Sequence, residues 1–402
     1  MDILYTSACS STATADFLLK TTQQFSGFQI TKFSQLFLKG LIANGVTATV
    51  LSNMKISPRE FWKQHDETEE GILYKYLRQT KLPVLRQISL FVSSFCHTIK
   101  WGLSGNKSEK LVLCDIFSTT TSMGCRTGAK MLGIPVCAIV TDMLGYSGTA
   151  PKNMPLWLKL IYALRGHFQQ HSISKYDGYV FLTQYMNEAY NSHQRPHIVM
   201  EGTVDADFIA ANSNPRKDKP RVIMYAGSIE KQYGLECLLQ AFIQAALPDA
   251  ELHLYGTGKF VEEVHAYTQQ YHTIKYQGAV SNAEVVAAEQ RATLLVNPRF
   301  SNQDFVKYSF PSKTTEYMVS GTPLLTTRLA GIPDEYFQYC YTFESETVDG
   351  FAQKLTEVLS LSDAELQAKG KSAQEFVLKY KNNIIQGARL KSFFQNILSA
   401  HR

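Results

Sequence analysis

Short apolar runs alternate with segments of helical periodicity along most of the chain. This alternation is typical of parallel strands that are joined by crossover helices. Ten runs are predicted as strands: 2–5, 46–51, 111–114, 136–140, 178–182, 197–200, 222–225, 251–255, 293–296 and 323–326. Between the later strands, helices are predicted at 234–245, 259–270, 282–290 and 312–320. The pattern therefore predicts an α/β protein.

Length and one polar segment divide the chain into two predicted domains. With 402 residues, the chain is about twice as long as a single domain. Residues 205–221 are polar, charged and contain proline, which indicates a linker. We predict two Rossmann-like domains, residues 1–205 and 217–384, whose parallel sheets face a central cleft. The closing stretch 363–400 is predicted to be helical, and its end, about 385–402, is expected to pack back on the first domain.

The composition is that of a globular protein, with 45% hydrophobic and 19% charged residues. There is no run of about 18 uncharged apolar residues, and the sequence opens with an acid and a strand-like stretch instead of a basic signal peptide. We therefore expect a cytoplasmic protein. The cysteines are odd in number, scattered and never spaced C-x-x-C, so we expect reduced packing residues: Cys9, Cys96, Cys114, Cys125, Cys137, Cys237 and Cys340.

Positive charge is concentrated in the first half of the chain. Residues 1–200 hold 20 Lys and Arg against 12 Asp and Glu, a net charge of +8, whereas 201–402 hold 20 against 23, a net charge of −3. Two segments, 82–101 and 155–168, place Lys or Arg among large apolar residues at helical spacing. They are either helices that lie in an anionic membrane interface or core helices with a charged outer face. We expect no nucleic acid partner.

Candidate chemistry follows the predicted strands of the second half. Four short elements stand there: 226–234, 255–258, 297–299 and 309–323. Loops at the carboxyl ends of parallel strands open onto one crevice, so we expect these elements to converge. The first two are glycine turns, which a tight connection between strand and helix favours. Lys231 and Arg299 are placed in these elements to meet an anion.

The predicted helix at 312–320 has the features of an anion-binding helix start. Pro311 fits its first turn, Ser312 can cap it, and Lys313 adds a full positive charge beside the backbone N–H groups. Glu316 lies one turn further on, where a carboxylate can accept both hydroxyls of a ribose. The alternative is structural: Ser312 only caps the helix and Glu316 only pairs with a neighbouring cation.

Six strings carry a family resemblance: AGSIEKQYGLECLLQAF, LHLYGTGKF, YQGAVSNAEV, LLVNPR, FPSKTTEYMVSGTPLLTT and GIPDEY. In order and spacing they resemble the donor half of retaining glycosyltransferases of family 4, which have the GT-B fold. Weaker similarity extends through the first half, in FSGF, LGIP, YDGYVFLT and VMEGTVD. The sequence is especially similar to members that build bacterial capsular polysaccharide, exopolysaccharide or lipopolysaccharide.

The resemblance implies a reaction. A hexose-type sugar moves from a nucleotide sugar to a glycan acceptor that is lipid-linked, at the inner face of the cell membrane, without a cofactor or a metal. A UDP-linked donor is the first expectation, and GDP-linked or dTDP-linked donors are the alternatives. Such enzymes need mainly stabilisation of the departing diphosphate, which is an electrostatic task. A first domain of +8 would be oriented toward an anionic leaflet.

The resemblance also implies the site residues. The donor-binding residues are Gly227, Ser228, Gly256, Gly258, Val280, Ser309, Phe310, Pro311, Ser312 and Glu316. The residues expected to stabilise the diphosphate are Lys231, Arg299 and Lys313. Ser26 and Gly27 stand in the acceptor loop position. Asp142 follows a first-domain strand, where a buried carboxylate could orient or deprotonate an acceptor hydroxyl, or cap the following turn.

The sequence departs from the family pattern at four positions. Tyr308 stands where the first of two glutamates is usual, Ser228 replaces an arginine, and Tyr233 replaces a lysine. The usual His-Asp pair reads Thr141-Asp142. Two customary diphosphate contacts are therefore missing, and Lys231 and Arg299 are the nearby substitutes.

Three alternatives to this function remain. A metal-dependent transferase would use the D-x-D pair Asp205 and Asp207, but these lie in the predicted linker, and the histidines form no ligand spacing. A sugar-nucleotide epimerase would need an acid and a base facing one sugar, and no clear pair is present. A non-catalytic sugar-binding module would normally be exported, which the missing signal peptide disfavours.

Overall fold

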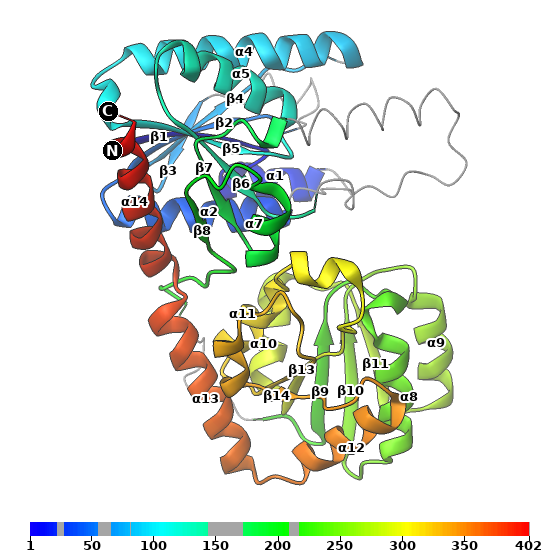
Figure 1. The fold of residues 1–402 in the computed structure, drawn as a ribbon. Helices are drawn as coiled ribbons and strands as arrows, with labels where there is room; N and C mark the ends of the chain where they lie inside the picture. The colour runs from blue at the N-terminus through cyan, green and yellow to red at the C-terminus, as the bar shows by residue number, and fades with distance from the viewer. Residues whose placement is uncertain (22–27, 55–65, 81, 144–171, 209–216, 402) are drawn as a thin grey trace. The chain divides into compact units, whose positions relative to one another are not determined.

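The computed structural model describes residues 1–21, 28–54, 66–80, 82–143, 172–208 and 217–401. The chain divides into two compact units (Figure 1). Unit 1 comprises Met1–Thr203 and Asn383–Arg402, and unit 2 comprises Val204–Asn382. The predicted segment 155–168 and the acceptor-loop residues Ser26 and Gly27 lie outside the described residues.

Unit 1 is built on an eight-stranded sheet. Its strands are β1 (Asp2–Ser7), β2 (Thr47–Ser52), β3 (Glu67–Glu69), β4 (Ile72–Tyr76), β5 (Lys110–Asp115), β6 (Val136–Val140), β7 (Gly178–Phe181) and β8 (His197–Val199). Their order is β3-β4-β2-β1-β5-β6-β7-β8, and all neighbours are parallel except β3 and β4. The helices described in this unit are α1 (Thr12–Thr21), α2 (Phe28–Ala43), α4 (Pro83–Leu103), α5 (Thr119–Met131), α7 (Gln184–Tyr190) and α14 (Asn383–Ala400).

Unit 2 is built on a six-stranded parallel sheet. Its strands are β9 (Arg221–Ala226), β10 (Ala250–Tyr255), β11 (Ile274–Gly278), β12 (Leu294–Asn297), β13 (Leu324–Thr326) and β14 (Tyr341–Thr342), in the order β11-β10-β9-β12-β13-β14. The helices described in it are α8 (Leu235–Ala245), α9 (Val261–Gln270), α10 (Asn282–Arg291), α11 (Ser312–Val319), α12 (Val348–Leu359) and α13 (Asp363–Tyr380).

All ten predicted strands and all four predicted inner helices are present, so the α/β class is confirmed. The apolar runs form the cores, because strands such as β5, β6 and β12 are buried along their whole length. Two predictions need correction. The helical stretch 363–400 is two helices that break at Lys381–Asn382, and residue 221 opens β9 instead of ending a linker.

Each sheet has a point where the strand order reverses. In unit 1, β1 lies between β2 and β5, and in unit 2, β9 lies between β10 and β12. Loops that leave the two central strands at such a point diverge to opposite faces of the sheet, which leaves a crevice for a ligand. The two switch points, β1/β5 and β9/β12, are therefore where functional side chains are expected.

Two further findings concern the chain as a whole. No helix among the described ranges is both long and apolar enough to cross a membrane. The cysteines are all free thiols, and five of them are buried. Cys237 is partly buried, and Cys96 is exposed on α4, so for Cys96 the prediction of a packing residue is wrong.

Candidate functional site

The glycine turns of unit 2 lie against one another at the carboxyl edge of the sheet. The backbone N–H of Ile229 donates to the carbonyl of Thr257 at 2.8 Å, and that of Gly227 donates to Tyr255 at 3.0 Å. Gly256 has φ +127°, and a Cβ atom there would overlap the carbonyl oxygen of Gly227. Only glycine allows this approach. The turns after β9 and β10 therefore form one continuous backbone surface.

The loop after β12 joins this surface on the other side of the switch point. Gly234, at φ +77°, lies against the carbonyl of Pro298, where a side chain would overlap the backbone. The guanidinium of Arg299 lies 4.4 Å from the centre of the Tyr233 ring, which is cation–π geometry. The carbonyl of Arg299 accepts a hydrogen bond from the Thr327 hydroxyl. Arg299 is thus held beside the β9 turn by its backbone and its side chain.

Helix α11 is tied directly to the end of β9. The hydroxyl of Tyr317 donates to the carbonyl of Ala226 at 3.0 Å and accepts the backbone N–H of the same residue at 2.8 Å. Tyr317 is fully buried. Because both polar atoms of Ala226 are bound by one side chain, the first turn of α11 has a fixed place at the switch point.

The start of α11 lacks a side-chain cap. Pro311 is the N-cap residue, with φ −68°, and no side chain caps the helix there. Ser312 is instead the first helical residue and is exposed, so the capping role predicted for it is wrong. Backbone N–H groups at an uncapped helix start, together with the helix dipole, favour an anion. Phe310 is buried against Tyr336, with ring centres 5.6 Å apart, and anchors the preceding loop.

A charged cluster stands on the first turn of α11. The ammonium group of Lys313 lies 2.7 Å from the carboxylate of Glu316 and 3.9 Å from that of Glu289, which is buried on α10. Burial lowers the pKa of Lys313, but the carboxylates of Glu316 and Glu289 outweigh this, and the pKa lies above its ordinary value. Lys313 is therefore a permanent cation beside the helix start.

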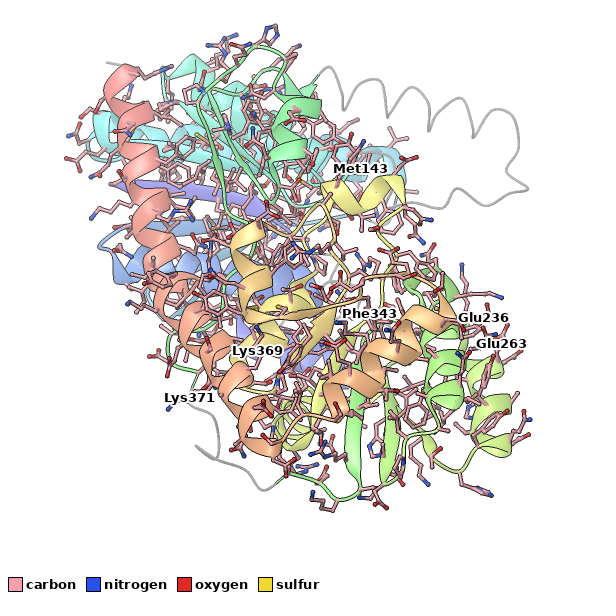
Figure 2. The ribbon with its side chains drawn as sticks, turned by 60° about the horizontal axis from the view of Figure 1, so that its bottom comes forward. Met143, Glu236, Glu263, Phe343, Lys369 and Lys371 are labelled. Carbon is pink, nitrogen blue, oxygen red and sulfur yellow. The ribbon has the colours of Figure 1, made fainter. Side chains whose placement is uncertain are left out.

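Lys231 has a carboxylate partner of its own. Its ammonium group pairs with Glu236 on α8 at 2.8 Å, and the side chain is mostly exposed. The hydrogen bond that Lys231 donates to Glu236 raises the pKa of Lys231, and the negative charge of Glu263 on α9 adds to the effect. Figure 2 shows Glu236 and Glu263 near each other. The described contacts thus place Lys231 toward α8 and α9, whereas Lys313 is held by α10 and α11.

Asp142 is exposed in the structure, so the burial predicted for it is wrong. Its carboxylate accepts the backbone N–H of Met143 at 2.8 Å, at the end of the described stretch (Figure 2). β6 ends two residues earlier, at Val140, and the side chain of Asp142 lies outside the core. The turn that Asp142 would cap begins outside the described residues, so both roles given to Asp142 stay predictions.

A buried acid at the switch point of unit 1 was not predicted from the sequence. Asp115 ends β5, and its carboxylate accepts the hydroxyl of Ser7, the last residue of β1, at 3.2 Å. It also accepts the backbone N–H of Phe117 at 3.0 Å. Burial raises the pKa of Asp115 to about 6, although these two hydrogen bonds oppose the rise. Its position directly after an apolar strand was a signal that could have revealed it.

A second carboxylate organises the loop after β1. Glu67 of β3 accepts hydrogen bonds from the hydroxyls of Ser11, Tyr76 and Thr14, the last at 2.9 Å. Glu69 accepts the backbone N–H of Thr12 at 2.7 Å. The carboxyl edge of unit 1 is therefore lined by hydroxyls and acids.

The remaining predicted residues take ordinary surface positions. Ser228 and Val280 are exposed at the glycine turns, and Gly258 lies against the backbone of Ile229. The ring of Tyr308 lies 5.1 Å from the ammonium group of Lys307. Ser309 precedes Phe310 and is partly buried.

Asp205 accepts the backbone N–H of Asp207, and the described part of the chain holds no cluster of metal ligands.

Two parallel-sheet units, each with polar chemistry at its switch point, define the class of fold, and comparison with known proteins agrees. Residues 220–361 match the family model of group 1 glycosyl transferases. No curated protein matches the chain by sequence.

Several solved structures resemble the whole chain. Sucrose-phosphate synthase from Thermosynechococcus elongatus has a TM-score of 0.67 at 14% identity, with 100% of both chains covered. Anabaena HepE, in complex with UDP-glucose, has a TM-score of 0.62 at 12% identity, covering 98% of this chain and 100% of that one. The lipopolysaccharide outer core galactosyltransferase WaaB has a TM-score of 0.60 at 14% identity, with 100% of both chains covered. The fold is therefore GT-B, as predicted.

Proposed function

We propose that this protein is a retaining glycosyltransferase that moves a hexose-type sugar from a nucleotide sugar to a glycan acceptor. The observation that carries the proposal is the uncapped start of α11, with Lys313 on its first turn and Tyr317 fixing it to the end of β9. This arrangement lies within the segment that matches group 1 glycosyl transferases. A UDP-linked donor is the first choice, since the structural neighbour HepE was solved with UDP-glucose.

In this proposal the two charges of α11 have different tasks. Glu316 accepts the ribose hydroxyls, and its ion pair with Lys313 holds the carboxylate near the first turn of the helix. Lys313, Arg299 and the backbone N–H groups of α11 stabilise the departing diphosphate. Fixed donors aimed at developing charge are the largest single contribution in many enzymes. A cation of this kind can take the place of a metal, so we propose a metal-independent reaction.

We propose that Lys231 also contacts the diphosphate, for which it has to leave its partner Glu236. Its ion pair with Glu236 is exposed, and exposed pairs contribute little to stability. A diphosphate carries more concentrated charge than a carboxylate, so the lysine can exchange one partner for the other. Its contribution to turnover should therefore be smaller than that of Lys313.

The acceptor belongs to unit 1 in this proposal. Its switch point presents hydroxyls and the buried acid Asp115, and Asp142 follows the next strand of the sheet. These groups suit an acceptor hydroxyl that has to be oriented or deprotonated. We further propose that the acceptor is lipid-linked, that the product is a bacterial surface polysaccharide, and that the enzyme works at the inner face of the membrane.

The test is a panel of nucleotide sugars, each incubated with and without a glycolipid acceptor and with a metal chelator. We expect transfer from one donor class, with retention of the anomeric configuration and no loss of rate with the chelator. Release of a free epimer would favour an epimerase. Donor binding by calorimetry without any turnover would favour a sugar-binding module.

A further inference from the structure

Helix α4 exposes several large apolar side chains to solvent, which is unusual for a helix of a water-soluble protein. A surface helix normally turns its large apolar residues inward and its polar residues to solvent. The side of α4 that faces α5 instead carries small polar residues, Ser94 and Thr98, which are fully buried. Figure 1 shows α4 and α5 lying along one another in unit 1.

Small residues of α5 complete this contact. A Cβ atom at Gly124 would overlap the hydroxyl of Ser94, and one at Gly128 would come within 3.2 Å of Thr98. The hydroxyl of Thr98 donates to the carbonyl of Ser94 at 2.8 Å, so its polar atom is satisfied inside its own helix. The two helices thus pack closely at small residues, and Leu90 is buried on α4, but other large apolar side chains of the helix are not buried.

Those large side chains face solvent. Val84, Leu85, Ile88 and Val92 are 72%, 50%, 55% and 51% exposed, and Leu103 at the far end of the helix is 61% exposed. Cys96 is exposed between them. Their spacing follows one face of the helix, so they form a single stripe along α4, called here the α4 stripe. Contiguous exposed apolar surface of this kind marks a site of interaction.

The stretch of sequence that contains the α4 stripe is basic, although one of its lysines, Lys75, pairs with Asp66 at 2.6 Å. Residues 71–108 contain no Asp or Glu, but six Lys and Arg: Lys75, Arg78, Lys81, Arg86, Lys100 and Lys107. Unit 1 as a whole holds 23 Lys and Arg against 13 Asp and Glu, a net charge of +10, whereas unit 2 holds 17 against 22, a net charge of −5. The excess of positive charge is thus a property of the unit that carries the stripe.

We infer that the α4 stripe is the surface by which the chain lies in the interface of an anionic membrane. Apolar side chains enter the boundary between headgroups and acyl chains, while flanking Lys and Arg meet anionic headgroups. A second copy of the chain fits less well, because a pair of α4 helices would bring two basic stretches of unit 1 together. This inference rests on the proposed location at the membrane and names the surface that makes the contact, and it is tested by binding without donor or acceptor.

Vesicle sedimentation with a matched pair of variants tests the inference. Ile88→Glu with Val92→Glu places two acids in the stripe, and Met131→Glu with Ile384→Glu places two acids at exposed apolar positions of unit 1 outside α4. On vesicles of phosphatidylglycerol and phosphatidylcholine, we expect the first variant to bind at least about tenfold more weakly than the wild type. The second should lose only about threefold, the effect of its charge alone.

A probe on Cys96 supplies a direct readout. Five cysteines are buried, so after Cys237→Ser a thiol-reactive, polarity-sensitive dye labels the exposed Cys96. Its emission should shift to the blue with anionic vesicles, remain unchanged with pure phosphatidylcholine, and lose the shift as salt screens the charges. The variant Ile88→Leu with Val92→Leu, which preserves apolarity, should behave as the wild type.

Three results would overturn the inference. Equal loss of binding in the two glutamate variants would assign the effect to net charge. Equal binding to neutral vesicles would remove the role of the basic flank. A lipid-free dimer that the stripe variant alone converts to a monomer would make a second copy the occupant. Circular dichroism of each variant confirms folding, and none of these measurements depends on sugar transfer.

Discussion

The two units carry opposite chemistry at equivalent places of similar sheets. At the β9/β12 switch point of unit 2, glycine turns expose backbone and two cations, Arg299 and Lys313, stand beside a helix start. At the β1/β5 switch point of unit 1, Ser7 donates to the buried acid Asp115. The first arrangement is suited to an anion, and the second is suited to hydroxyl groups.

The net charge of each unit is opposite in sign to the charge of the residues named at its switch point. The unit with the cationic switch point has a net charge of −5, and the unit with the acidic one has +10. A site can therefore not be inferred from the charge of its domain. The charge of unit 1 has to be explained by its surface, and the stretch 71–108, which contains the α4 stripe, has no Asp or Glu. Long-range fields and local sites are separate properties of this chain.

The largest effect on activity is expected when a cation is removed from the switch point of unit 2. Arg299→Met keeps an apolar stem over the Tyr233 ring but deletes the guanidinium. If Arg299 stabilises the departing diphosphate, turnover should fall by about 100-fold to 1,000-fold. Single-turnover kinetics with saturating donor measures the loss.

The matched control for this variant is Lys371→Met. Lys371 is an exposed cation of the same unit on α13, 4.0 Å from Glu375 (Figure 2). It should leave turnover and melting temperature as in the wild type. A comparable loss of rate in both variants would mean that the overall field, and not the position of Arg299, matters.

The second prediction concerns the acid of unit 1. The pKa of Asp115 rises from an ordinary 3.8 to about 6 because the carboxyl is buried. The folded chain therefore holds this proton more tightly than the unfolded chain between about pH 4 and pH 6, and the free energy of unfolding falls as pH rises through that range. Ionised Asp115 should cost about 3 kcal/mol at neutral pH.

The variant Asp115→Asn isolates this effect. Because asparagine does not ionise, the variant should be more stable than the wild type at about pH 8 and similar to it below about pH 4. Urea unfolding at the two pH values measures the difference. A difference that does not depend on pH would show that the carboxyl does not titrate in this range and that the change is one of packing.

Much of this architecture could be predicted from the sequence because apolar periodicity determines it. β6 occupies the predicted 136–140, and α11 begins at the predicted Ser312. The strand β3 was missed because Glu67–Glu69 is polar and lies at a sheet edge, where burial leaves no pattern, whereas β4 was missed although its burial alternates. The break at Lys381–Asn382 was missed because both flanking segments have helical periodicity.

The partners of site residues were harder to predict, because they come from distant elements. Glu289 meets Lys313 only through the packing of α10 beside α11, and Ser7 meets Asp115 across 108 positions of sequence. The exposure of Asp142 depends on where the chain turns after β6, which a single acid does not reveal. Local signals thus predicted the elements that meet at the β9/β12 switch point, and tertiary contacts decided the ion pairs there.

The third prediction sharpens the assignment of the donor to unit 2. Glu316→Ala should weaken donor binding by about 1.5–3 kcal/mol, the range for hydrogen bonds to a charged group. Calorimetry with the free nucleotide measures the loss, and the corresponding nucleotide with a 2′-deoxyribose separates ribose contacts from others. If Glu316 holds the ribose, the variant should no longer distinguish the two nucleotides. Undiminished affinity of the variant would refute the ribose contact.

The smallest effect is expected at Lys231, and it tests whether the cationic side of unit 2 extends beyond α11. Lys231 is exposed and paired with Glu236, so Lys231→Ala should lower turnover by only about twofold to threefold. Glu236→Gln is the complementary change, because it releases Lys231 and should raise donor affinity slightly if the lysine exchanges its carboxylate for a diphosphate. A wild-type rate for Lys231→Ala, with no response to Glu236→Gln, would limit the cationic site to Arg299, Lys313 and the start of α11.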